Sequence, residues 1–255
     1  MPAMRRRGAP GAWVLPKGLA IVHEDPDVLV VDKPPGLLTI ATEREKTNTA
    51  YAILTDYVRK GDPRSRRRVF IVHRLDRESS GLLVFAKSEE AKFRLQGHWD
   101  ATEKKYAAVV HGRLEKKEGT IEAFLAENQE GTVFEPSNPS KGRPCRTAYR
   151  VLKEAKDFSL LDVNLITGRK HQIRVHLAGI GHPIVGDPRY GRAGDAQKRM
   201  ALHASSLSFP HPFTGRRLAF ASSPPGHFAA LMGRNQKEEH CVVVDFISKS
   251  KQKKT

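Results

Sequence analysis

Cysteine is scarce in this chain, because Cys145 and Cys241 are the only two among 255 residues. Two cysteines exclude the disulfide framework of a small secreted domain, and no Cys/His cluster has the spacing of a zinc site. Long apolar runs are missing too, since no stretch of about 18 residues is apolar enough to span a bilayer. These absences predict a globular protein of the reducing cytoplasm that has no metal site and no membrane partner.

Acidic residues are few relative to basic ones. The chain has 44 Lys and Arg against 28 Asp and Glu, which gives a formal net charge of +16. Such an excess favours a polyanionic partner, because neutralised phosphates release their counterions. The alternatives are a generally basic surface and binding to anionic lipid, but no amphipathic anchor supports the lipid interpretation.

The composition divides the chain into three parts. Residues 1–15 form a basic flexible tail that lacks the apolar core of a signal peptide. Its Arg5–Arg7 triplet fits a targeting signal or a nucleic-acid arm, but a plain disordered tail is favoured over both. A chain of 255 residues can bury a core as one large domain or as two small ones, and residues 16–233 are expected to form one catalytic domain. Residues 234–255 form a second basic tail, of which 248–254 are all Ser, Lys or Gln.

The apolar patterning predicts an α+β domain with a mixed, largely antiparallel sheet, because strands come in runs with few strand–helix–strand units. Helices are expected at 47–60, capped by Thr47 or Thr49, and at 89–99, capped by Ser88. Two more are expected, one opening within 168–178 and a short one ending at 231. Residues 112–143 are expected to form a hairpin region with a long loop. The expected strands are 20–24, 28–33, 69–72, 82–85, 105–111, 147–153, 158–166, 201–209 and 218–221.

The most informative segment is 73–81 (HRLDRESSG), which lies between two short apolar runs. Such runs are typical of buried strands, so the segment is predicted to be a loop on a rigid scaffold, where reactive residues tend to lie. Arg74 and Arg77 flank Asp76, and their charges favour its ionised form. An ionised carboxylate can act as a nucleophile or as a base. The alternative is a surface turn whose ion pairs carry no chemistry.

Basic residues gather again in segment 168–191, where a helix is expected to begin. A helix N-terminus attracts anions through its free N–H groups and its dipole. His171 and Arg174 are three residues apart and therefore share a helix face. The segment thus predicts an anion-binding surface, and the alternative is a solvated basic face. The cations concerned are Arg169, Lys170, His171 and Arg174.

Five segments, spread from about Ile21 to Met232, resemble the motifs of the RluA-type pseudouridine synthases, in the same order. Residues 73–81 resemble that family's HRLDRxTSG loop, with Ser79 in place of Thr. Residues 32–38 (DKPPGLL) resemble its NKPxGxxxHP loop, although Asp32 replaces Asn and the His-Pro is absent. The other matches are 104–112 (KKYAAVVHG) to the KxYxAxVxG strand, 168–191 to the GRxHQIRxH helix and GHPIxGDxxYG turn, and 202–204 to the LHA strand.

The resemblance implies a pseudouridine synthase fold, in which a sheet of two halves has a central catalytic cleft, with no metal and no cofactor. It implies isomerisation of a uridine in rRNA or tRNA to pseudouridine. Many relatives carry a small N-terminal RNA-binding domain, which we do not expect here. RNA affinity would then come from the basic domain itself, including Arg66–Arg68. We expect a monomer with no obligate protein partner.

The resemblance also implies roles for single residues. Asp76 would be the catalytic carboxylate, Arg174 would pair with it, and Tyr106 would contact the target base. The base must leave its stack to reach a buried aspartate, and Arg74 would fill the space that it leaves. The expected RNA-binding residues are Arg74, Arg77, Arg169, Lys170 and His171.

Two other functions compete with this one. A nucleoside or glycoside hydrolase needs a pair of carboxylates flanking the bond, and Glu78 is the only candidate near Asp76. A non-catalytic RNA-binding module would fit the net charge of +16 equally well. Such a module has no use for an aspartate in a basic site, because a carboxylate repels phosphate. A DNA-binding protein is less favoured, since no helix-turn-helix, zinc-finger or zipper pattern is present.

Overall fold

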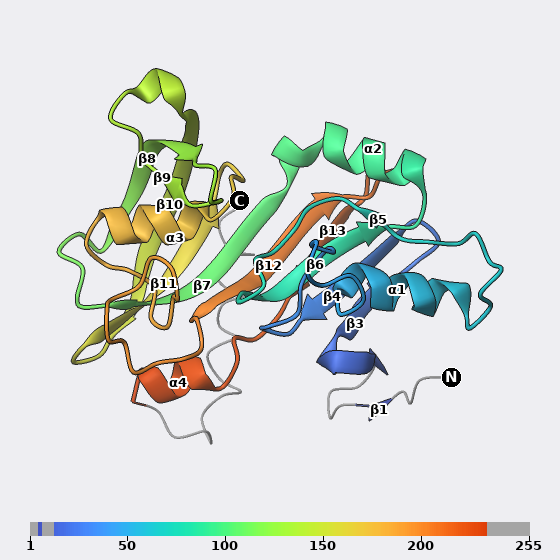
Figure 1. Cartoon of the computed structure of the whole chain (residues 1–255), viewed down its shortest axis with the longest axis horizontal. Helices are drawn as coiled ribbons and strands as arrows, with labels where there is room; N and C mark the ends of the chain where they lie inside the picture. The colour runs from blue at the N-terminus through green and yellow to red at the C-terminus, as the bar shows by residue number, and fades with distance from the viewer. Residues whose placement is uncertain (1–4, 7–12, 234–255) are drawn as a thin grey trace, which may run out of the picture. The chain divides into compact units, whose positions relative to one another are not determined.

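The computed structural model describes residues 5–6 and 13–233, which form an α+β fold with mostly antiparallel strands (Figure 1). This confirms the predicted fold class. The predicted C-terminal tail and most of the N-terminal tail lie outside the described residues. The chain forms two compact units: Met1–Tyr106 with Asn164–Ile166 and Leu202–Ser222, and Ala107–Val163 with Thr167–Ala201 and Ser223–Thr255.

Strands of the first unit follow the order β1-β2-β3-β4-β6-β12, with β5 beside β6 and β13 beside β12. The pair of β6 with β12 is parallel, while β3, β4, β5 and β13 pair with antiparallel neighbours. The strands β1 and β2 fall within the predicted tail 1–15. The bounds are β1 Arg5–Arg6, β2 Trp13–Val14, β3 Ala20–Glu24, β4 Val28–Lys33, β5 Phe70–Ile71, β6 Ser80–Ala86, β12 Leu202–Pro210 and β13 Arg217–Ala221.

The helices of the first unit begin at the predicted caps. The Oγ1 of Thr49 accepts a hydrogen bond from the N–H of Ala52 at the start of α1 (Ala50–Arg59), and the Oγ of Ser88 accepts one from Ala91 at the start of α2 (Glu89–Gly97). Short 3₁₀ turns occur at Pro16–Gly18 and Trp99–Ala101. The core between α2 and the sheet consists of Val28, Val30, Val72, Leu82, Val84, Ala86, Ala91, Leu95, Leu207 and Phe209.

The second unit has the strand order β7-β11-β10-β8-β9, and α3 packs against β8, β9 and β10 (Figure 1). The strand β7 begins in the first unit and continues into the second. The predicted hairpin region contains β8 and β9, and β10 starts earlier than expected. The bounds are β7 Glu103–His111, β8 Glu118–Glu127, β9 Val133–Phe134, β10 Arg143–Glu154, β11 Phe158–Leu165, α3 Gln172–Gly179, α4 His227–Leu231 and a 3₁₀ turn at Pro139–Lys141.

A cysteine–histidine contact lies in the core of the second unit. The Sγ of Cys145 is 3.1 Å from the Nε2 of His176, and both side chains are buried. Burial raises the pKa of the Cys145 thiol and lowers the pKa of His176 to about 4. Both groups are therefore neutral near pH 7, so the contact is not a thiolate–imidazolium pair of the kind that activates a nucleophile.

None of the helices within residues 13–233 has the length and the apolar character that a membrane-spanning helix needs.

Candidate active site

Lys33, the last residue of β4, holds the loop that contains Asp76. Its side chain is fully buried, so its ammonium group must find acceptors within the protein. It finds them on the backbone of two segments, one following β4 and one in the loop 73–81. The acceptors are the carbonyl oxygens of Pro34 at 3.1 Å, Leu37 at 2.8 Å, Arg77 at 3.3 Å and Ser79 at 2.6 Å.

The charge of Lys33 is balanced by carboxylates close to it. Burial lowers the pKa of Lys33 to about 7, and the carboxylates of Asp76, Glu78 and Asp32 oppose this shift. Four carbonyl acceptors also favour the ammonium form, which has three N–H donors and no acceptor. Lys33 therefore places a cation near Asp76 and fixes the backbone that follows it.

Two further contacts fix the backbone on either side of Asp76. The hydroxyl of Thr39 donates to the carbonyl of Leu75 at 2.8 Å and accepts from its N–H at 3.2 Å. On the other side, the N–H of Gly36 donates to the carbonyl of Arg77 at 2.7 Å, and the Nε of Arg77 donates to the carbonyl of Gly36 at 3.2 Å. The segment after β4 therefore cradles the loop, a role that its sequence did not reveal.

The loop enters β6 at a point where the backbones approach closely. Gly81 has a φ of +110°, and a Cβ at this position would lie 2.3 Å from the carbonyl oxygen of Ala204. A residue with a side chain is therefore excluded. Beside it, the Oγ of Ser80 lies 2.9 Å from the Nδ1 of His203. The weakly matching segment 202–204 thus supports the end of the loop.

Tyr106 lies on β7 in the first unit and is buried. Burial raises the pKa of its hydroxyl, and the nearby carboxylate of Asp76 raises it further. The fold therefore brings these two predicted site residues together, one a half-buried carboxylate and the other a neutral phenol. Arg74 and Arg77, predicted to bind RNA, are exposed on the same loop.

Arg174, on α3 of the second unit, forms a buried ion pair with Asp187. The Nε of Arg174 donates to one carboxylate oxygen at 2.7 Å and Nη2 donates to the other at 2.7 Å. Burial would raise the pKa of Asp187, but Arg174 and the backbone N–H groups of Tyr190 and Arg189 bring it below its usual value. The pair joins α3 to the turn 186–191. Asp76 belongs to the other unit, so its pairing with Arg174 stays a prediction.

The remaining cations predicted in the second unit lie at the start of α3. His171 has a left-handed backbone, with a φ of 52°, and its Nδ1 lies 2.9 Å from the hydroxyl of Tyr190. Lys170 pairs with Glu127, and Arg169 is exposed. The side chain of Gln172 accepts from the N–H of Arg169 at 3.0 Å and so orders this turn. The structure therefore places Arg169, Lys170 and His171 at the start of α3, whereas Arg174 is buried in its pair with Asp187, and RNA binding by these residues stays a prediction.

Four residues of these two clusters were not predicted to belong to the site: Lys33, Thr39, Asp187 and Tyr190. Lys33 ends β4, with only Asp32 between it and the apolar run 28–31, and a lysine in such a place is a signal of a buried, partnered ammonium. Asp187 and Tyr190 belong to the turn motif quoted for residues 168–191, which showed their presence but not their contacts. Thr39 gave no signal, because its partner Leu75 is distant in sequence.

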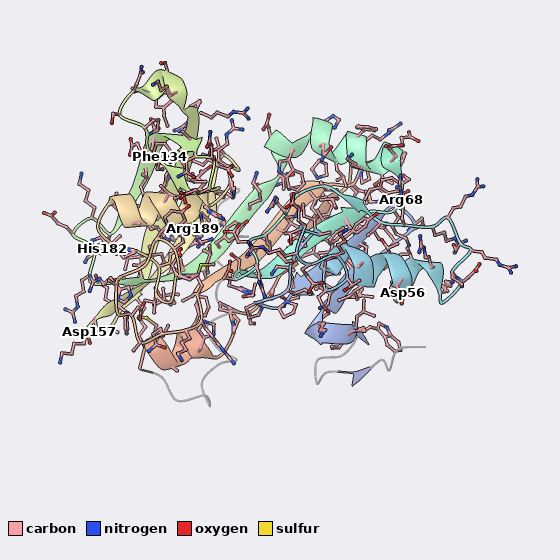
Figure 2. The ribbon with its side chains drawn as sticks, viewed as in Figure 1. Asp56, Arg68, Phe134, Asp157, His182 and Arg189 are labelled. Carbon is pink, nitrogen blue, oxygen red and sulfur yellow. The ribbon has the colours of Figure 1, made fainter. Side chains whose placement is uncertain are left out.

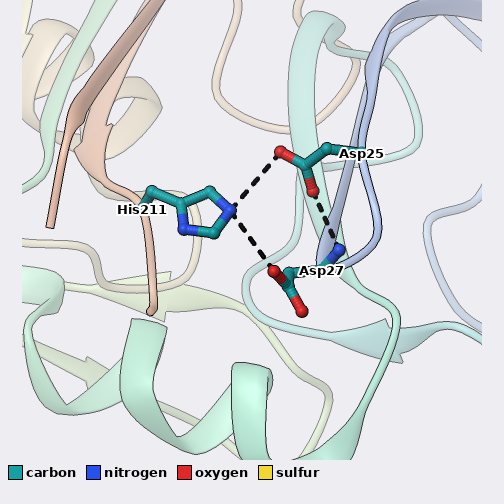
Figure 3. A group of neighbouring side chains, drawn as sticks. All are labelled: Asp25, Asp27 and His211. Atoms are coloured by element: carbon teal, nitrogen blue, oxygen red, sulfur yellow. Dashed lines mark hydrogen bonds and ion pairs between the residues drawn. The ribbon is translucent and has the colours of Figure 1, made fainter. Parts of the chain in front are cut away.

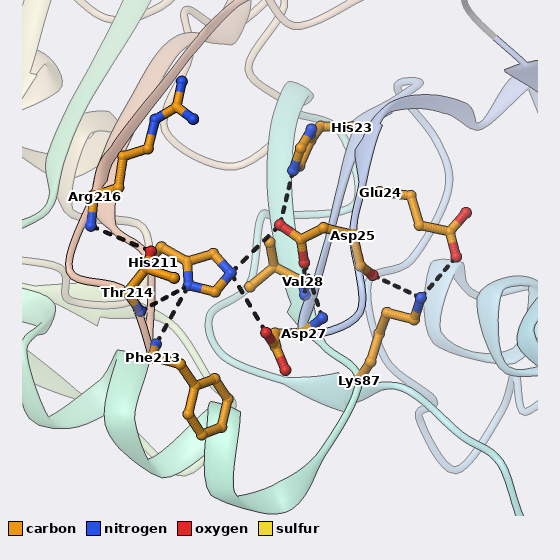
Figure 4. Close-up of polar contacts among 10 residues, drawn as sticks. All are labelled: His23, Glu24, Asp25, Asp27, Val28, Lys87, His211, Phe213, Thr214 and Arg216. Carbon is orange, nitrogen blue, oxygen red and sulfur yellow. Dashed lines mark hydrogen bonds and ion pairs between the residues drawn. The ribbon is translucent and has the colours of Figure 1, made fainter.

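Asp25, Asp27 and His211 form the group in the described residues that could hold a metal ion (Figure 3). The Nε2 of His211 lies 3.5 Å from a carboxylate oxygen of each aspartate. Its Nδ1, however, accepts from the backbone N–H groups of Phe213 at 3.3 Å and Thr214 at 3.2 Å (Figure 4). An acceptor at Nδ1 places the proton on Nε2, whereas a metal needs the Nε2 lone pair.

The contacts of the aspartates agree with this interpretation. Asp25 accepts from the N–H groups of Asp27 at 2.8 Å and Val28 at 2.7 Å, and its other oxygen lies 2.9 Å from the Nε2 of His23. These bonds close the turn between β3 and β4, and His211 ties the turn after β12 to it (Figure 4). The group is therefore a hydrogen-bonded tie between two turns.

Comparisons with known proteins agree with the site. Residues 27–179 match the family model of RNA pseudouridylate synthases. The ribosomal large subunit pseudouridine synthase D of Nitrosomonas europaea is 38% identical over 227 residues, which cover 84% of this chain and 64% of that protein. The uncharacterized RNA pseudouridine synthase YlyB of Bacillus subtilis is 36% identical over 230 residues, 87% of this chain and 74% of that protein.

A solved structure leads to the same family. Human RNA pseudouridylate synthase domain containing 1 superposes with a TM-score of 0.67 at 26% identity, over 84% of this chain and 86% of that one. The match to the family model includes β4, the loop with Asp76, Tyr106 and all of α3. This chain therefore belongs to the RNA pseudouridylate synthase family.

Proposed function

We propose that this chain isomerises a uridine in structured RNA to pseudouridine, with Asp76 as the catalytic carboxylate. In this reaction the bond between carbon 1′ of the sugar and nitrogen 1 of uracil breaks, the base rotates, and carbon 5 bonds to the same sugar carbon. The observation that carries the proposal is the proximity of Asp76 to the buried Tyr106, in a loop whose backbone is held on both sides. Neither a metal nor a cofactor is needed for this chemistry.

Asp76 can start the reaction by three routes: attack on carbon 1′, addition to carbon 6 of the base, or removal of the proton at carbon 2′. Each needs the Asp76 carboxylate at a fixed position, which the hydrogen bonds to the backbone of its loop provide. Tyr106 stacks on the uracil and, because its hydroxyl stays neutral, adds no competing charge. The target base reaches this site by leaving its helical stack.

Arg174 is proposed to hold the Asp76 carboxylate in the complete enzyme. An arginine has five N–H groups in a planar fork, and the pair with Asp187 uses those on Nε and Nη2. We assign the Nη1 group to Asp76. Asp187 would then orient the guanidinium while Arg174 orients the catalytic carboxylate.

Arg174→Lys is expected to lower turnover by about 10²-fold, because a single ammonium cannot hold two carboxylates in the geometry of a fork. Single-turnover assays on the RNA substrate measure this loss. Asp187→Asn is the informative companion, since it weakens the tie to the turn but keeps the arginine. We expect Arg174→Lys to lose more turnover than Asp187→Asn, which keeps the guanidinium; near-normal turnover of Arg174→Lys would show that the pairing with Asp76 is wrong. Arg189→Lys, an exposed change in the same turn, serves as the control.

The substrate is proposed to be rRNA or tRNA. The net charge of +16 and the exposed cations Arg74, Arg77, Arg169 and Lys170 support a polyanionic partner. Pseudouridine mapping of rRNA and tRNA from cells with and without the gene tests both the activity and the target. A site that loses pseudouridine with the gene, and regains it with the purified protein, is the expected result; unchanged maps would contradict the proposal. The monomeric state and the cytoplasmic location stay predictions.

A further inference from the structure

A cavity in the first unit lies away from the catalytic loop. It has a volume of about 450 Å³ and is formed by the end of α1, the arginine segment before β5, the turn between β3 and β4, and the residue after β6. Figure 2 labels Arg68, one of its cations. The residues that line it are Glu24, Pro26, Tyr57, Val58, Lys60, Arg67, Arg68 and Lys87.

Positive charge predominates in this cavity. Four cations and one carboxylate line it, and that carboxylate, Glu24, accepts from the hydroxyl of Tyr57 at 2.8 Å and pairs with Lys87 at 2.9 Å. Within residues 13–233, the side chains of Lys60 and Arg67 have no acidic partner within 4.0 Å. Arg68 is held over the ring of Phe70, 4.8 Å from its centre. The cavity is therefore lined by cations, Lys60 and Arg67, that can bind an anion.

The backbone conformation of Lys60 is a second indication that a cation is needed at this position of the cavity. Lys60 ends α1 in the left-handed conformation, with a φ of 55°. Glycine is the residue usually found in this conformation at a helix end, because it has no Cβ. Lysine here is less favourable for folding than glycine would be, and it nonetheless lines the cavity.

The cavity is too far from Asp76 to hold the target uridine. The strand β6 begins at Ser80, next to the catalytic loop, and Lys87 follows its last residue. At about 3.3 Å per residue, Lys87 lies about 23 Å from Ser80. A group bound here belongs to a part of the RNA beyond the flipped nucleotide.

We propose that this cavity binds backbone phosphates of the substrate RNA, on the stem that flanks the target uridine. The inference rests on the proposed function, since it takes the bound polyanion to be the RNA that Asp76 modifies. Helical RNA presents phosphates and 2′-hydroxyls rather than readable base edges, so cations are the expected means of gripping a stem. The site fixes the position of the stem, while the catalytic loop handles the flipped base.

Lys60→Gly combined with Arg67→Ala tests the proposal. For a fluorescently labelled hairpin RNA with a uridine loop, we expect weaker binding and a slope of log affinity against log salt that is smaller by about 2. Because Lys60→Gly relieves the left-handed backbone, the melting temperature should not fall, which separates lost binding from lost folding. The matched control is Lys92→Ala with Arg216→Ala, two cations of the same unit outside the cavity, which should leave the slope unchanged.

Cross-linking places the RNA on the protein. A hairpin with 4-thiouridine in its stem should cross-link to the peptide that holds residues 57–68, and the double variant should lose this product. Uridine triphosphate, which carries phosphate without a stem, should not compete at concentrations where the hairpin saturates. An unchanged salt slope, a missing cross-link, or tight Lys60-dependent binding of the triphosphate would each overturn the proposal. Since these are binding measurements, they stay interpretable if no pseudouridine is formed.

Discussion

Asp76→Asn is expected to abolish pseudouridine formation while the protein still folds and binds RNA. The amide keeps the shape of the side chain but supplies neither a nucleophile nor a base of comparable strength. The loss in turnover should reach at least about 10²–10⁴-fold, the contribution of a positioned acid or base. Single-turnover assays on the mapped substrate measure it, with RNA affinity and melting temperature recorded on the same samples.

Glu78→Gln is the matched control, because it removes a second carboxylate from the same loop. Under the proposed isomerisation this variant keeps most of its turnover. Under the competing hydrolase mechanism, which needs two carboxylates, it would lose activity as Asp76→Asn does. Mass spectrometry of the product separates the reactions further, since hydrolysis releases uracil and isomerisation leaves the mass of the RNA unchanged. Near-normal turnover of Asp76→Asn would end the proposed mechanism.

Lys33→Met is expected to destabilise the fold by about 3–5 kcal/mol, the usual cost of removing one partner from a buried charged group. The methionine fills a similar volume, but it leaves four carbonyl oxygens without their donor and removes the cation near Asp76. Turnover should fall in the protein that remains folded, because the loop loses two of its ties. Urea unfolding gives the free energy, and assays well below the unfolding midpoint give the turnover.

Thr39→Val is the milder companion to Lys33→Met. It removes both hydrogen bonds to Leu75 with little change in shape, so we expect a cost of about 1–3 kcal/mol and a folded protein with reduced turnover. Lys117→Met, an exposed lysine that donates to the carbonyl of Leu114 at 2.7 Å, should change neither quantity. A Lys33→Met protein as stable and active as the parent would show that the clamp is dispensable.

Local sequence was sufficient to predict much of the fold. The apolar runs of β4 and β6 and the caps Thr49 and Ser88 depend on neighbouring residues, so periodicity and capping rules find them. The strand β8 was less visible, because most of its side chains are exposed or half-buried and give no apolar run. The strand β5 is also shorter than its apolar run suggested.

The candidate site was harder to predict where contacts join distant residues. Tyr106 and Asp76 were found through motifs, and their proximity needed the fold. Lys33 donates to the carbonyl of Ser79, 46 residues away. Every residue has a backbone carbonyl, so the sequence does not show which one will accept this hydrogen bond. Asp187 binds Arg174 across 13 residues, and although both lie in segment 168–191, its motifs do not show that the two side chains meet.

The loop around Asp76 is held mainly through its main chain. Its carbonyl and N–H groups form hydrogen bonds with Lys33, Thr39 and Gly36. Main-chain groups are the same whatever side chain they carry. Exchanges at Arg74 or Glu78, which are exposed or half-buried, can therefore alter what the loop presents to RNA without moving the carboxylate, whereas Ser79 is buried. The loop can therefore accept new side chains while its backbone stays in place. Libraries at Arg74 and Glu78 are where a search for variants with another RNA target should begin.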